Sequence, residues 1–267
     1  MVSLAEGDRT RVVITESMQP EEYGVMFRAE ETHWWYHALH QLIFQTLESE
    51  VPDWRGKKTL DAGCGTGSIL KRLGNPAKNV GVDLAPEAVS FCQQRGLTNV
   101  QQANICALPF VNASFDVVVC SSVLYHQWVE DPAAAVRELH RVLRPGGLLL
   151  LNVPALRFLH SAHDEAVMTA HRFSKSEIRQ LLRDNGFAIC RLTYWTTLLF
   201  PLAVIARTLG GSATGRDFHF AADSLPNRLF TRIMALELRL LKRASLPIGV
   251  ALLAAARKQA AGKRNGS

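Results

Sequence analysis

Hydrophobic and polar residues follow two different periods along the middle of the chain. Short continuous apolar runs, typical of buried strands, alternate with stretches in which apolar residues recur every three or four positions, as on one face of a helix. The patterns predict strands at 58–61, 80–83, 100–103, 115–121 and 148–153, and helices at 68–73, 86–95 and 132–143. Such alternation is typical of an α/β protein with a mainly parallel sheet and helices on both faces. The run Leu148–Leu151 is apolar throughout, so we expect its strand in the interior of the sheet.

The pattern continues on both sides of this central region. A helical period over residues 30–48 predicts a helix ahead of the first strand. The spacing of Ser174 and Glu177 is that of a capping box, and it predicts a helix that ends at Asn185-Gly186. Residues 187–194 form a further predicted strand. Residues 249–258 fit a strand or, because they are rich in alanine, a helix.

These elements divide the chain into four predicted parts. They are an N-terminal helical extension (1–55), an α/β domain (56–195 with 246–258), a helical insert (196–245) and a flexible tail (259–267). We also expect residues 1–19 to be flexible. The insert consists of an apolar segment, 196–206, and an amphipathic one, 227–243. It fits a cap packed on the sheet, and its apolar face also fits a membrane surface, the roof of a greasy pocket or a second copy of the chain.

Charge and composition narrow the partners that this chain can have. The net charge is +6, but residues from 201 onward carry eleven Lys or Arg against three acids, so the rest of the chain is slightly acidic. Leu, Ile and Met are interleaved with these basic residues, a pattern that suits an anionic lipid surface better than a base-stacking groove. Nucleic acid is therefore an unlikely partner, and peripheral membrane contact through 196–245 is a candidate. The pattern predicts no oligomeric state.

The same composition indicates a cellular compartment. Five scattered cysteines without a Cys-x-x-Cys pair are typical of a reducing environment. We find no apolar run of signal-peptide length in residues 1–13, and no run of the length that spans a bilayer. The expected location is cytoplasmic, with peripheral membrane contact as the variant.

The strongest chemical signal is the glycine-rich turn that follows the first predicted strand. Gly63, Gly65 and Gly67 leave out side chains where a ligand can pass close to the backbone, and the next helix points free N–H groups at the same place. Asp83 ends the second strand, where a carboxylate can accept both hydroxyls of a ribose. Asp83 also fits a helix N-cap role, and both roles are compatible. By itself the turn fits a strand–helix connection without a ligand.

Further motifs stand in a fixed order after this turn. They are Leu60–Ser68, Asn104–Phe110 with its Leu-Pro-Phe, Ser114–Val119, Leu124–His126, and Glu138–Gly147 with its Arg-Pro-Gly-Gly. Together they resemble the class I S-adenosylmethionine-dependent methyltransferases over residues 56–190, about half of the chain. The resemblance implies a doubly wound, seven-stranded, mainly parallel sheet with an antiparallel last strand, so 249–258 is interpreted as that strand. A dinucleotide dehydrogenase more often carries Gly-x-Gly-x-x-Gly and lacks the later motifs.

The resemblance also implies a binding site for S-adenosyl-L-methionine. Asp61 and Gly63 would meet the methionine end of the cofactor, Asp83 its ribose, and Asn104 with the Ile105 backbone its adenine. Leu84 and Leu108 fit adenine walls or ordinary core residues, and Cys64 is interpreted as a small filler. The expected cofactor-binding residues are Asp61, Gly63, Cys64, Gly65, Gly67, Asp83, Leu84, Asn104, Ile105 and Ser121.

Three residues are candidates for catalysis, namely His126, His171 and Asp164. His126 follows the fourth predicted strand and could accept a proton from a substrate hydroxyl, or could be structural. The cluster of His160, His163, Asp164 and His171 lacks regular ligand spacing, so no metal is predicted.

Two segments resemble a bacterial methyltransferase subgroup with a His-Trp-Trp helix before the sheet. One segment is Glu31–Tyr36. The other runs from Asp164 to Arg172 and Phe173, where Phe173 replaces a tyrosine of the subgroup. Trp34 and Trp35 then fit an anchor of the helix or an aromatic lid near a sulfonium.

These observations lead to one function and two alternatives. The chain is expected to be a methyltransferase that moves a methyl group from S-adenosylmethionine to a small-molecule or lipid-like acceptor, at oxygen, because histidines suit hydroxyl deprotonation. The first alternative is N- or C-methylation at the same site. The second is a non-catalytic cofactor-binding protein whose insert docks on a membrane or partner.

Overall fold

A seven-stranded sheet organises the chain in the computed structural model, which describes residues 18, 20–160, 164–165, 167–208 and 221–260. The strand order is β3-β2-β1-β4-β5-β7-β6. The strands are β1 (Thr59–Ala62), β2 (Val80–Asp83), β3 (Val100–Gln102), β4 (Phe115–Ser121), β5 (Leu143–Pro154), β6 (Phe187–Trp195) and β7 (Ala251–Lys258). All neighbouring pairs are parallel except those of β7, which runs antiparallel to both β5 and β6. The predicted α/β class, with an antiparallel last strand, is confirmed.

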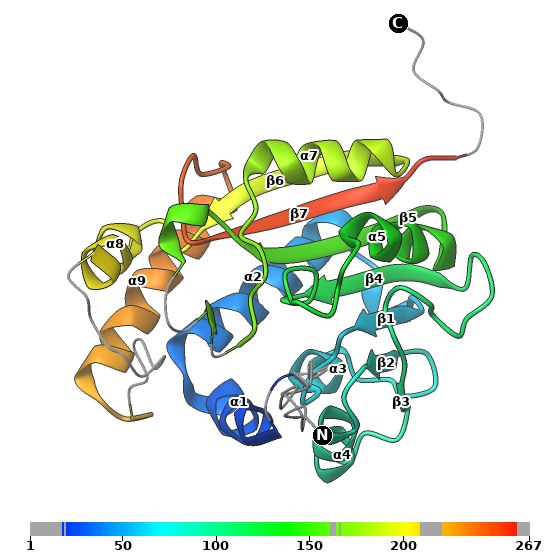
Figure 1. Cartoon of the computed structure of the whole chain (residues 1–267), viewed down its shortest axis with the longest axis horizontal. Coiled ribbons are helices and arrows are strands. Elements are labelled where there is room, and N and C mark those ends of the chain that lie inside the picture. Colours follow the sequence, from blue (N-terminus) through cyan, green and yellow to red (C-terminus); the bar gives the residue numbers. More distant parts are fainter. Residues whose placement is uncertain (1–17, 19, 161–163, 166, 209–220, 261–267) are drawn as a thin grey trace, which may run out of the picture.

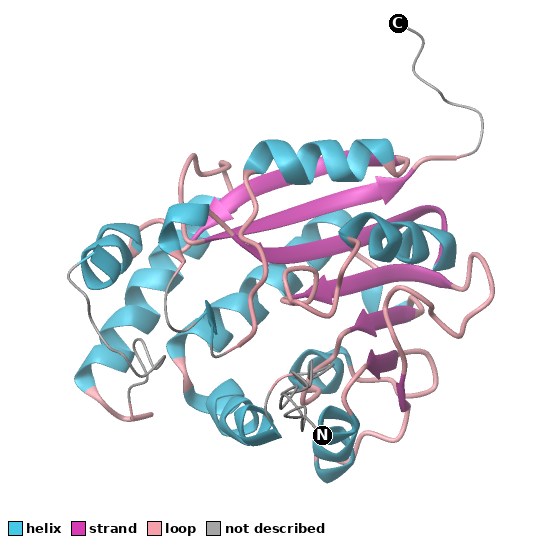
Figure 2. Cartoon of the chain, viewed as in Figure 1, coloured by secondary structure: helices cyan, strands magenta, loops and turns pink. Residues whose placement is uncertain are grey.

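Helices cover both faces of this sheet (Figures 1 and 2). They are α1 (Pro20–Thr32), α2 (Trp34–Glu50), α3 (Ser68–Leu73), α4 (Pro86–Gln94), α5 (Pro132–Val142), α7 (Lys175–Asp184), α8 (Phe200–Thr208) and α9 (Leu225–Leu241), with short 3-10 turns η1 (Trp54–Gly56) and η2 (Arg157–Leu159). One core lies under α5 and α7, and a second lies under α2, α3 and α9. Alternate residues of β5 enter the two cores, because successive strand side chains point to opposite faces. Leu149 and Leu151 belong to the first core, and Leu148 and Leu150 to the second.

Several predicted boundaries differ from the observed ones. The helix expected over 30–48 is interrupted at His33 and forms parts of α1 and α2. His33 has an extended backbone and is the N-cap of α2. Its ring Nδ1 accepts a hydrogen bond from the Trp35 N–H (3.3 Å). Strand β5 begins at Leu143, so the Arg-Pro-Gly-Gly segment lies inside the strand beside an irregular pairing with β4. The last strand begins at Ala251, two residues later than expected. The capping box of Ser174 and Glu177 is confirmed, with both reciprocal hydrogen bonds present.

The insert packs on the N-terminal helices. Helix α9 lies against α2, and the side chain of Asn227 accepts a hydrogen bond from the Trp34 N–H (3.0 Å). The Gln45 amide of α2 donates to the Leu238 carbonyl of α9 (3.1 Å). The insert therefore extends the helical layer on one face of the sheet. Within the described part of the chain, we find no helix of the length and apolarity that a bilayer crossing needs. Residues 1–17 and 261–267, which include most of the segments predicted to be flexible, lie outside the described residues.

Candidate functional site

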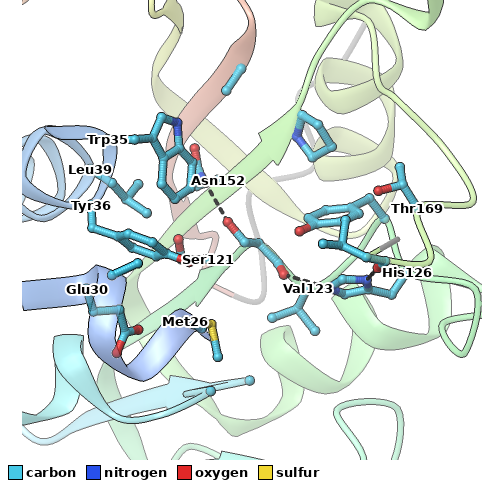
Figure 3. A pocket seen from close by; sticks show the side chains of 18 of the residues that line it. Met26, Glu30, Trp35, Tyr36, Leu39, Ser121, Val123, His126, Asn152 and Thr169 are labelled. Atoms are coloured by element: carbon cyan, nitrogen blue, oxygen red, sulfur yellow. Dashed lines mark hydrogen bonds between the residues drawn. The ribbon is translucent and has the colours of Figure 1, made fainter. Parts of the chain in front are cut away.

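A cavity of about 350 Å³ opens at the carboxyl ends of the central strands. Its floor includes Gly63 after β1, Asp83 at the end of β2 and Ser121 at the end of β4. Helices α1 and α2 cover it, and Figure 3 shows Glu30, Tyr36 and Leu39 from these helices opposite Ser121 and Val123. The carboxyl edge of an open α/β sheet is where this fold class places ligands. The position of the cavity therefore follows from the strand order.

The glycine turn is explained by backbone conformation and by packing inside the protein. Gly63, Gly65 and Gly67 have φ values of 80°, 53° and 86°, a region that side chains with a Cβ adopt at a cost. A Cβ at Gly63 would overlap Val123, and one at Gly67 would meet Leu97. The sequence interpretation, in which each missing side chain makes room for a ligand, is therefore corrected. Protein atoms occupy those spaces, and Gly67 lies behind the cavity wall as the N-cap of α3.

Asp83 is fixed by two main-chain amides. Its Oδ2 accepts a hydrogen bond from Gly65 (2.8 Å), and its Oδ1 accepts one from Ala85 (3.1 Å). The N-cap of α4 is Ala85, so Asp83 makes the turn before the helix and does not cap it. Burial raises the pKa of Asp83, and the Ala85 and Gly65 N–H groups oppose that rise. The carboxylate lines the cavity with lone pairs left for further donors.

Asp61 lies beneath the cavity and does not line it. The residue is 1% exposed, and among the described residues no group meets hydrogen-bond geometry with either carboxyl oxygen, although the Leu70 main chain is close enough to oppose the rise of its pKa. Burial raises the pKa of Asp61 to about 8, and the nearby charges of Glu30 and Asp83 act in the same direction. A buried acid without a partner is costly, so such a group is often found at a functional site.

The remaining predicted cofactor residues divide between the cavity and the core. Cys64, Leu84, Asn104, Ile105 and Ser121 line the cavity. The side-chain oxygen of Asn104, Oδ1, accepts a hydrogen bond from the Cys106 main-chain N–H (2.8 Å), and its second lone pair remains available. The Ser121 hydroxyl is buried without a partner. Leu108 is 4% exposed and belongs to the core under α5, so it is an ordinary core residue.

An ion-pair cluster that the sequence did not indicate fastens α1 over the cavity. The Arg95 guanidinium of the α4 C-terminus donates to Glu30 (2.7 Å), to the Phe27 carbonyl (3.1 Å) and to the Thr66 carbonyl (2.7 Å). Arg95 also pairs with Glu31, and the Thr66 hydroxyl donates to Glu30. Burial raises the pKa of Glu30. No sequence signal joined Glu30 to Arg95, because 65 residues separate them along the chain.

His126 is a cavity residue whose ring is held by the main chain. Its Nδ1 faces the Val167 carbonyl (2.9 Å), and its Nε2 faces the Ser122 carbonyl (3.1 Å) (Figure 3). Burial lowers the pKa of His126 to about 4. The ring also stacks on Trp128, with centroids 4.1 Å apart. Both ring nitrogens are therefore directed at backbone acceptors.

Asp164 and His171, the other two candidates for catalysis, lie in different surroundings. Asp164 lines the cavity and forms a buried two-point ion pair with Arg172, at 2.9 and 3.1 Å. His171 is not among the cavity residues, and its Nε2 lies 3.4 Å from Glu177. Across the residues that the structure describes, no group of three or more His, Cys, Asp or Glu side chains is arranged to hold a metal ion. His163 lies outside those residues.

The two tryptophans of the predicted His-Trp-Trp segment anchor α2 and also line the cavity. The Trp34 ring meets Phe230 of α9 edge to face, with centroids 5.4 Å apart. The Trp35 ring lies 5.6 Å from that of Trp195, at the end of β6. The aromatic pairs therefore join α2 to the insert and to the sheet, and the tryptophans have both an anchoring and a cavity-lining position.

Comparison with known proteins finds methyltransferases that are similar to this chain. Residues 60–151 match a family model described as a methyltransferase domain. A probable S-adenosylmethionine-dependent methyltransferase of Mycolicibacterium smegmatis is 32% identical over 165 residues, which cover 60% of this chain and 62% of the relative. A malonyl-[acyl-carrier protein] O-methyltransferase of Erwinia billingiae is 35% identical over 135 residues, which cover 50% of this chain and 53% of that protein. The chain thus spans about three fifths or less of the length of these relatives.

A solved structure extends the likeness in fold. The putative methyltransferase of Haloferax volcanii, determined in complex with the Trm112 methyltransferase activator, superposes with a TM-score of 0.61 at 21% identity. The match covers 91% of this chain and 97% of that one. At this identity the likeness concerns the fold alone. The assignment to a His-Trp-Trp subgroup stays a prediction.

Proposed function

Because the chain belongs to the class I S-adenosylmethionine-dependent methyltransferase family, we propose that it transfers a methyl group from S-adenosylmethionine to an oxygen of a small-molecule or lipid-like acceptor. The observation that carries the proposal is one continuous cavity. It joins the glycine turn and Asp83 at one end to the apolar side chains of α2, α8 and α9 at the other. A cofactor and an acceptor can therefore meet without solvent between them, as methyl transfer requires.

The residues present fit the cofactor. Asp83, aimed by the Gly65 and Ala85 amides, would hold the ribose hydroxyls. Asn104, Ile105 and Leu84 would receive the adenine, and Gly63 with the Asp61 region the methionine end. The cofactor supplies an activated methyl group on a cationic sulfur. Glu30 and Asp83 line this end of the cavity and Asp61 lies beneath it, so a positive charge there would offset the cost of ionising these buried carboxyl groups.

The protein's own residues would align the reactants and keep water out. Helix α1, held down through Glu30 and Arg95, covers the cofactor end. His126 is proposed as a structural residue of the wall. Its lowered pKa keeps the ring neutral near pH 7, so its single N–H can donate to one of the two carbonyl oxygens that flank the ring. Asp164 is proposed to position Arg172, which also donates to the Ala155 carbonyl (3.0 Å).

We propose oxygen as the methylated atom because named relatives are O-methyltransferases, and not because a histidine is placed as a base. The relative from Erwinia billingiae is an O-methyltransferase by name, and so is the ubiquinone biosynthesis O-methyltransferase of Idiomarina loihiensis, 29% identical over 152 residues. His171 does not line the cavity, and both ring nitrogens of His126 face main-chain carbonyls, so neither histidine is placed to deprotonate an acceptor hydroxyl. Product analysis of the methylated atom decides between oxygen and N- or C-methylation.

The proposal is tested by binding and by turnover. Calorimetry should detect S-adenosylmethionine binding to the wild type and at least about tenfold weaker binding to Asp83→Asn, which loses the carboxylate charge and one acceptor. The matched control is Asp184→Asn, an exposed aspartate at the end of α7, and it should bind as the wild type does. Equal affinity in Asp83→Asn would remove this residue from the site.

Turnover separates an enzyme from a cofactor-binding protein. Lipid and small-metabolite extracts incubated with methyl-labelled S-adenosylmethionine should yield a labelled product, identified by mass spectrometry. Binding of the cofactor without any transfer from a broad set of extracts would favour the non-catalytic alternative.

We also propose peripheral contact with an anionic membrane surface through the outer side of α9. Leu225, Leu229, Leu236 and Leu240 are 79%, 55%, 53% and 44% exposed, and their spacing places them on one side of the helix. Exposed basic residues flank them, namely Arg228, Arg232, Arg239 and Arg243. An apolar stripe beside basic side chains is the pattern of helices that lie in a lipid interface. Such a contact would bring the insert close to lipid-like acceptors.

A further inference from the structure

The half of the cavity that lies away from the glycine turn has a distinct wall. Three helices and the start of β7 contribute to it, and the side chains are mostly apolar: Trp34, Leu39, Leu199, Leu202, Ala203, Phe230, Val250 and Ala251. Leu202 is 39% exposed, so the wall reaches the protein surface at α8. This half, which we call the insert subsite, is therefore apolar, and in the described part of the chain it opens at α8.

A strained residue stands in this wall. Thr196 has φ 59°, a left-handed conformation that is a genuine outlier for a β-branched residue. Its hydroxyl is buried and has no hydrogen-bond partner in the part of the chain that the structure describes, and the residue lines the cavity. Strain of this kind persists only where the surroundings over-determine it, and it concentrates at binding sites.

The surroundings of Thr196 do over-determine it. The Glu237 carboxylate, fully buried on α9, accepts hydrogen bonds from the N–H groups of Thr196 (2.5 Å) and Leu198 (2.8 Å). The indole N–H of the preceding Trp195 donates to Asn152 (2.9 Å). Three contacts from two other elements thus hold the turn between β6 and α8. The turn keeps a polar side chain in an apolar wall, where a threonine hydroxyl without a partner costs stability.

A second unpaired polar group lies at the start of α2, beside α9. The Trp34 indole N–H is buried and has no hydrogen-bond partner among the described residues, and its ring packs on Phe230 of α9. Phe230 and Glu237 are seven residues apart on α9, which is about 10 Å along the axis. The insert subsite therefore extends along the helix and has one hydrogen-bonding group near each end.

Among the residues that the structure describes, the charged groups beside the subsite are already engaged. The Arg172 guanidinium is bound to Asp164 and to the Ala155 carbonyl, and Glu237 holds the turn. Burial of a charged acceptor would cost desolvation energy that no new opposite charge offsets, and burial of an uncharged acceptor avoids this cost.

From these observations we propose that the insert subsite binds an uncharged, elongated apolar acceptor, and that Thr196 determines specificity by bonding to a polar group on it. That this ligand is a methyl acceptor rests on the proposed function, but its binding can be measured without turnover. The ligand class is that of long-chain alcohols, neutral esters and related lipids.

Binding is tested with the full chain and two probes of equal length, n-decanol and decanoate. Calorimetry, with tryptophan fluorescence as a second readout, should give saturable binding of decanol and at least about tenfold weaker binding of decanoate at neutral pH. Ala203→Phe fills the subsite and should abolish decanol binding. Its matched control, Ile205→Phe, changes an exposed position of the same helix and should leave decanol affinity unchanged.

Two milder variants keep the test valid if Ala203→Phe fails to fold. Thr196→Val preserves the branched shape and removes the hydroxyl, so decanol should bind about 3- to 10-fold more weakly, the value of one hydrogen bond. Leu202→Gln makes the mouth polar and should weaken decanol binding as well. Decanoate binding as tightly as decanol, or unchanged decanol affinity in Thr196→Val and Leu202→Gln, overturns the inference.

The outcomes separate this inference from the proposed function. S-adenosylmethionine affinity is measured on the same samples and should not change in Thr196→Val. Cofactor binding without decanol binding refutes the insert subsite alone. Decanol binding without cofactor binding refutes the proposed function and leaves the subsite as a lipid-binding cavity.

Discussion

Single residues at the cavity explain why the motif of the glycine turn has its particular composition. Glycine is favoured at position 63 for two reasons. The backbone has a φ of 80°, and a Cβ there would overlap the Val123 side chain. The turn then brings the Gly65 N–H to Asp83, which fixes the carboxylate at the cavity floor. The sequence motif predicted these residues as a group. The physical reason for each glycine lies in contacts between residues distant in the sequence.

Gly63→Ala should lower the free energy of unfolding by about 2–4 kcal/mol, since a left-handed alanine and an overpacked contact both cost energy. The matched control is Gly96→Ala, at φ 79° with open space around the missing Cβ, which should cost only the strain, about 1 kcal/mol. Urea denaturation measures both. Val123→Ala should recover part of the loss in the Gly63→Ala background, and strictly additive effects in that double-mutant cycle would argue against the overlap.

Asp61 should make stability depend on pH. Its folded pKa of about 8 lies above the ordinary value for an unfolded aspartate, so between pH about 4 and 8 the folded state binds more protons. The stabilisation is therefore present below about pH 4 and is lost as the pH rises to 8. Asp61→Asn should gain at least about 1 kcal/mol relative to the wild type between pH 5 and pH 8, or about 2–4 °C in Tm. Parallel pH curves of the two proteins would contradict this.

At the scale of elements, helix α1 is joined to α4 by the contacts of Arg95 and by a small apolar cluster that includes Tyr23 and Ala88. Arg95 binds Glu30 and the Phe27 carbonyl from the end of α4, and its side chain is 3% exposed. The helix covers the cofactor end of the cavity, so its docking and ligand binding are linked. The periodicity of residues 30–48 predicted a helix but missed the break at His33. The helical period of the sequence continues across the break, so periodicity alone does not reveal it. The break depends on the N-cap at His33, where a ring nitrogen accepts the hydrogen bond.

Arg95→Ala should release α1, because it leaves the buried Glu30 without its cation, a change that typically costs about 3–5 kcal/mol. Hydrogen exchange of residues 20–32 should become faster than in the wild type, with a smaller effect for Arg95→Lys. The matched control is Arg55→Ala, whose partner Glu48 is exposed like Arg55 itself, so its removal should change little. Wild-type protection of α1 in Arg95→Ala would show that other contacts hold the helix.

At the scale of the whole molecule, one helix serves two surfaces. Helix α9 buries Phe230, Met234 and Leu238 against the second core, and exposes leucines and arginines on its other side. The excess of basic residues from position 201 onward, which the sequence shows, is thereby placed partly beside an apolar stripe. The cavity reaches the surface at α8, in the same insert. This arrangement connects the proposed membrane contact with the proposed acceptor.

Vesicle flotation measures the membrane contact. The wild type should float with vesicles that contain phosphatidylserine, more weakly at high salt, and should not float with phosphatidylcholine alone. Leu229→Gln with Leu236→Gln, and separately Arg232→Gln with Arg239→Gln, should reduce flotation. Val111→Gln, an exposed apolar residue elsewhere, is the control. If the leucine variants instead convert a dimer to a monomer in light scattering, with flotation unchanged, the stripe is a self-association surface.

The sequence by itself determined the α/β class, the order of strands and helices, and the place of the glycine turn and Asp83, because these depend on local periodicity and on short-range backbone chemistry. It also indicated the tryptophans of α2 and the amphipathic segment that forms α9. Tertiary structure decided how these parts meet. The pairing of Glu30 with Arg95, the Val167 carbonyl beside His126, and the strained Thr196 held by Glu237 join positions 41 to 65 residues apart. The packing of the elements also leaves His171 and Leu108 outside the cavity wall. Such contacts depend on where the elements pack, and no local pattern records them.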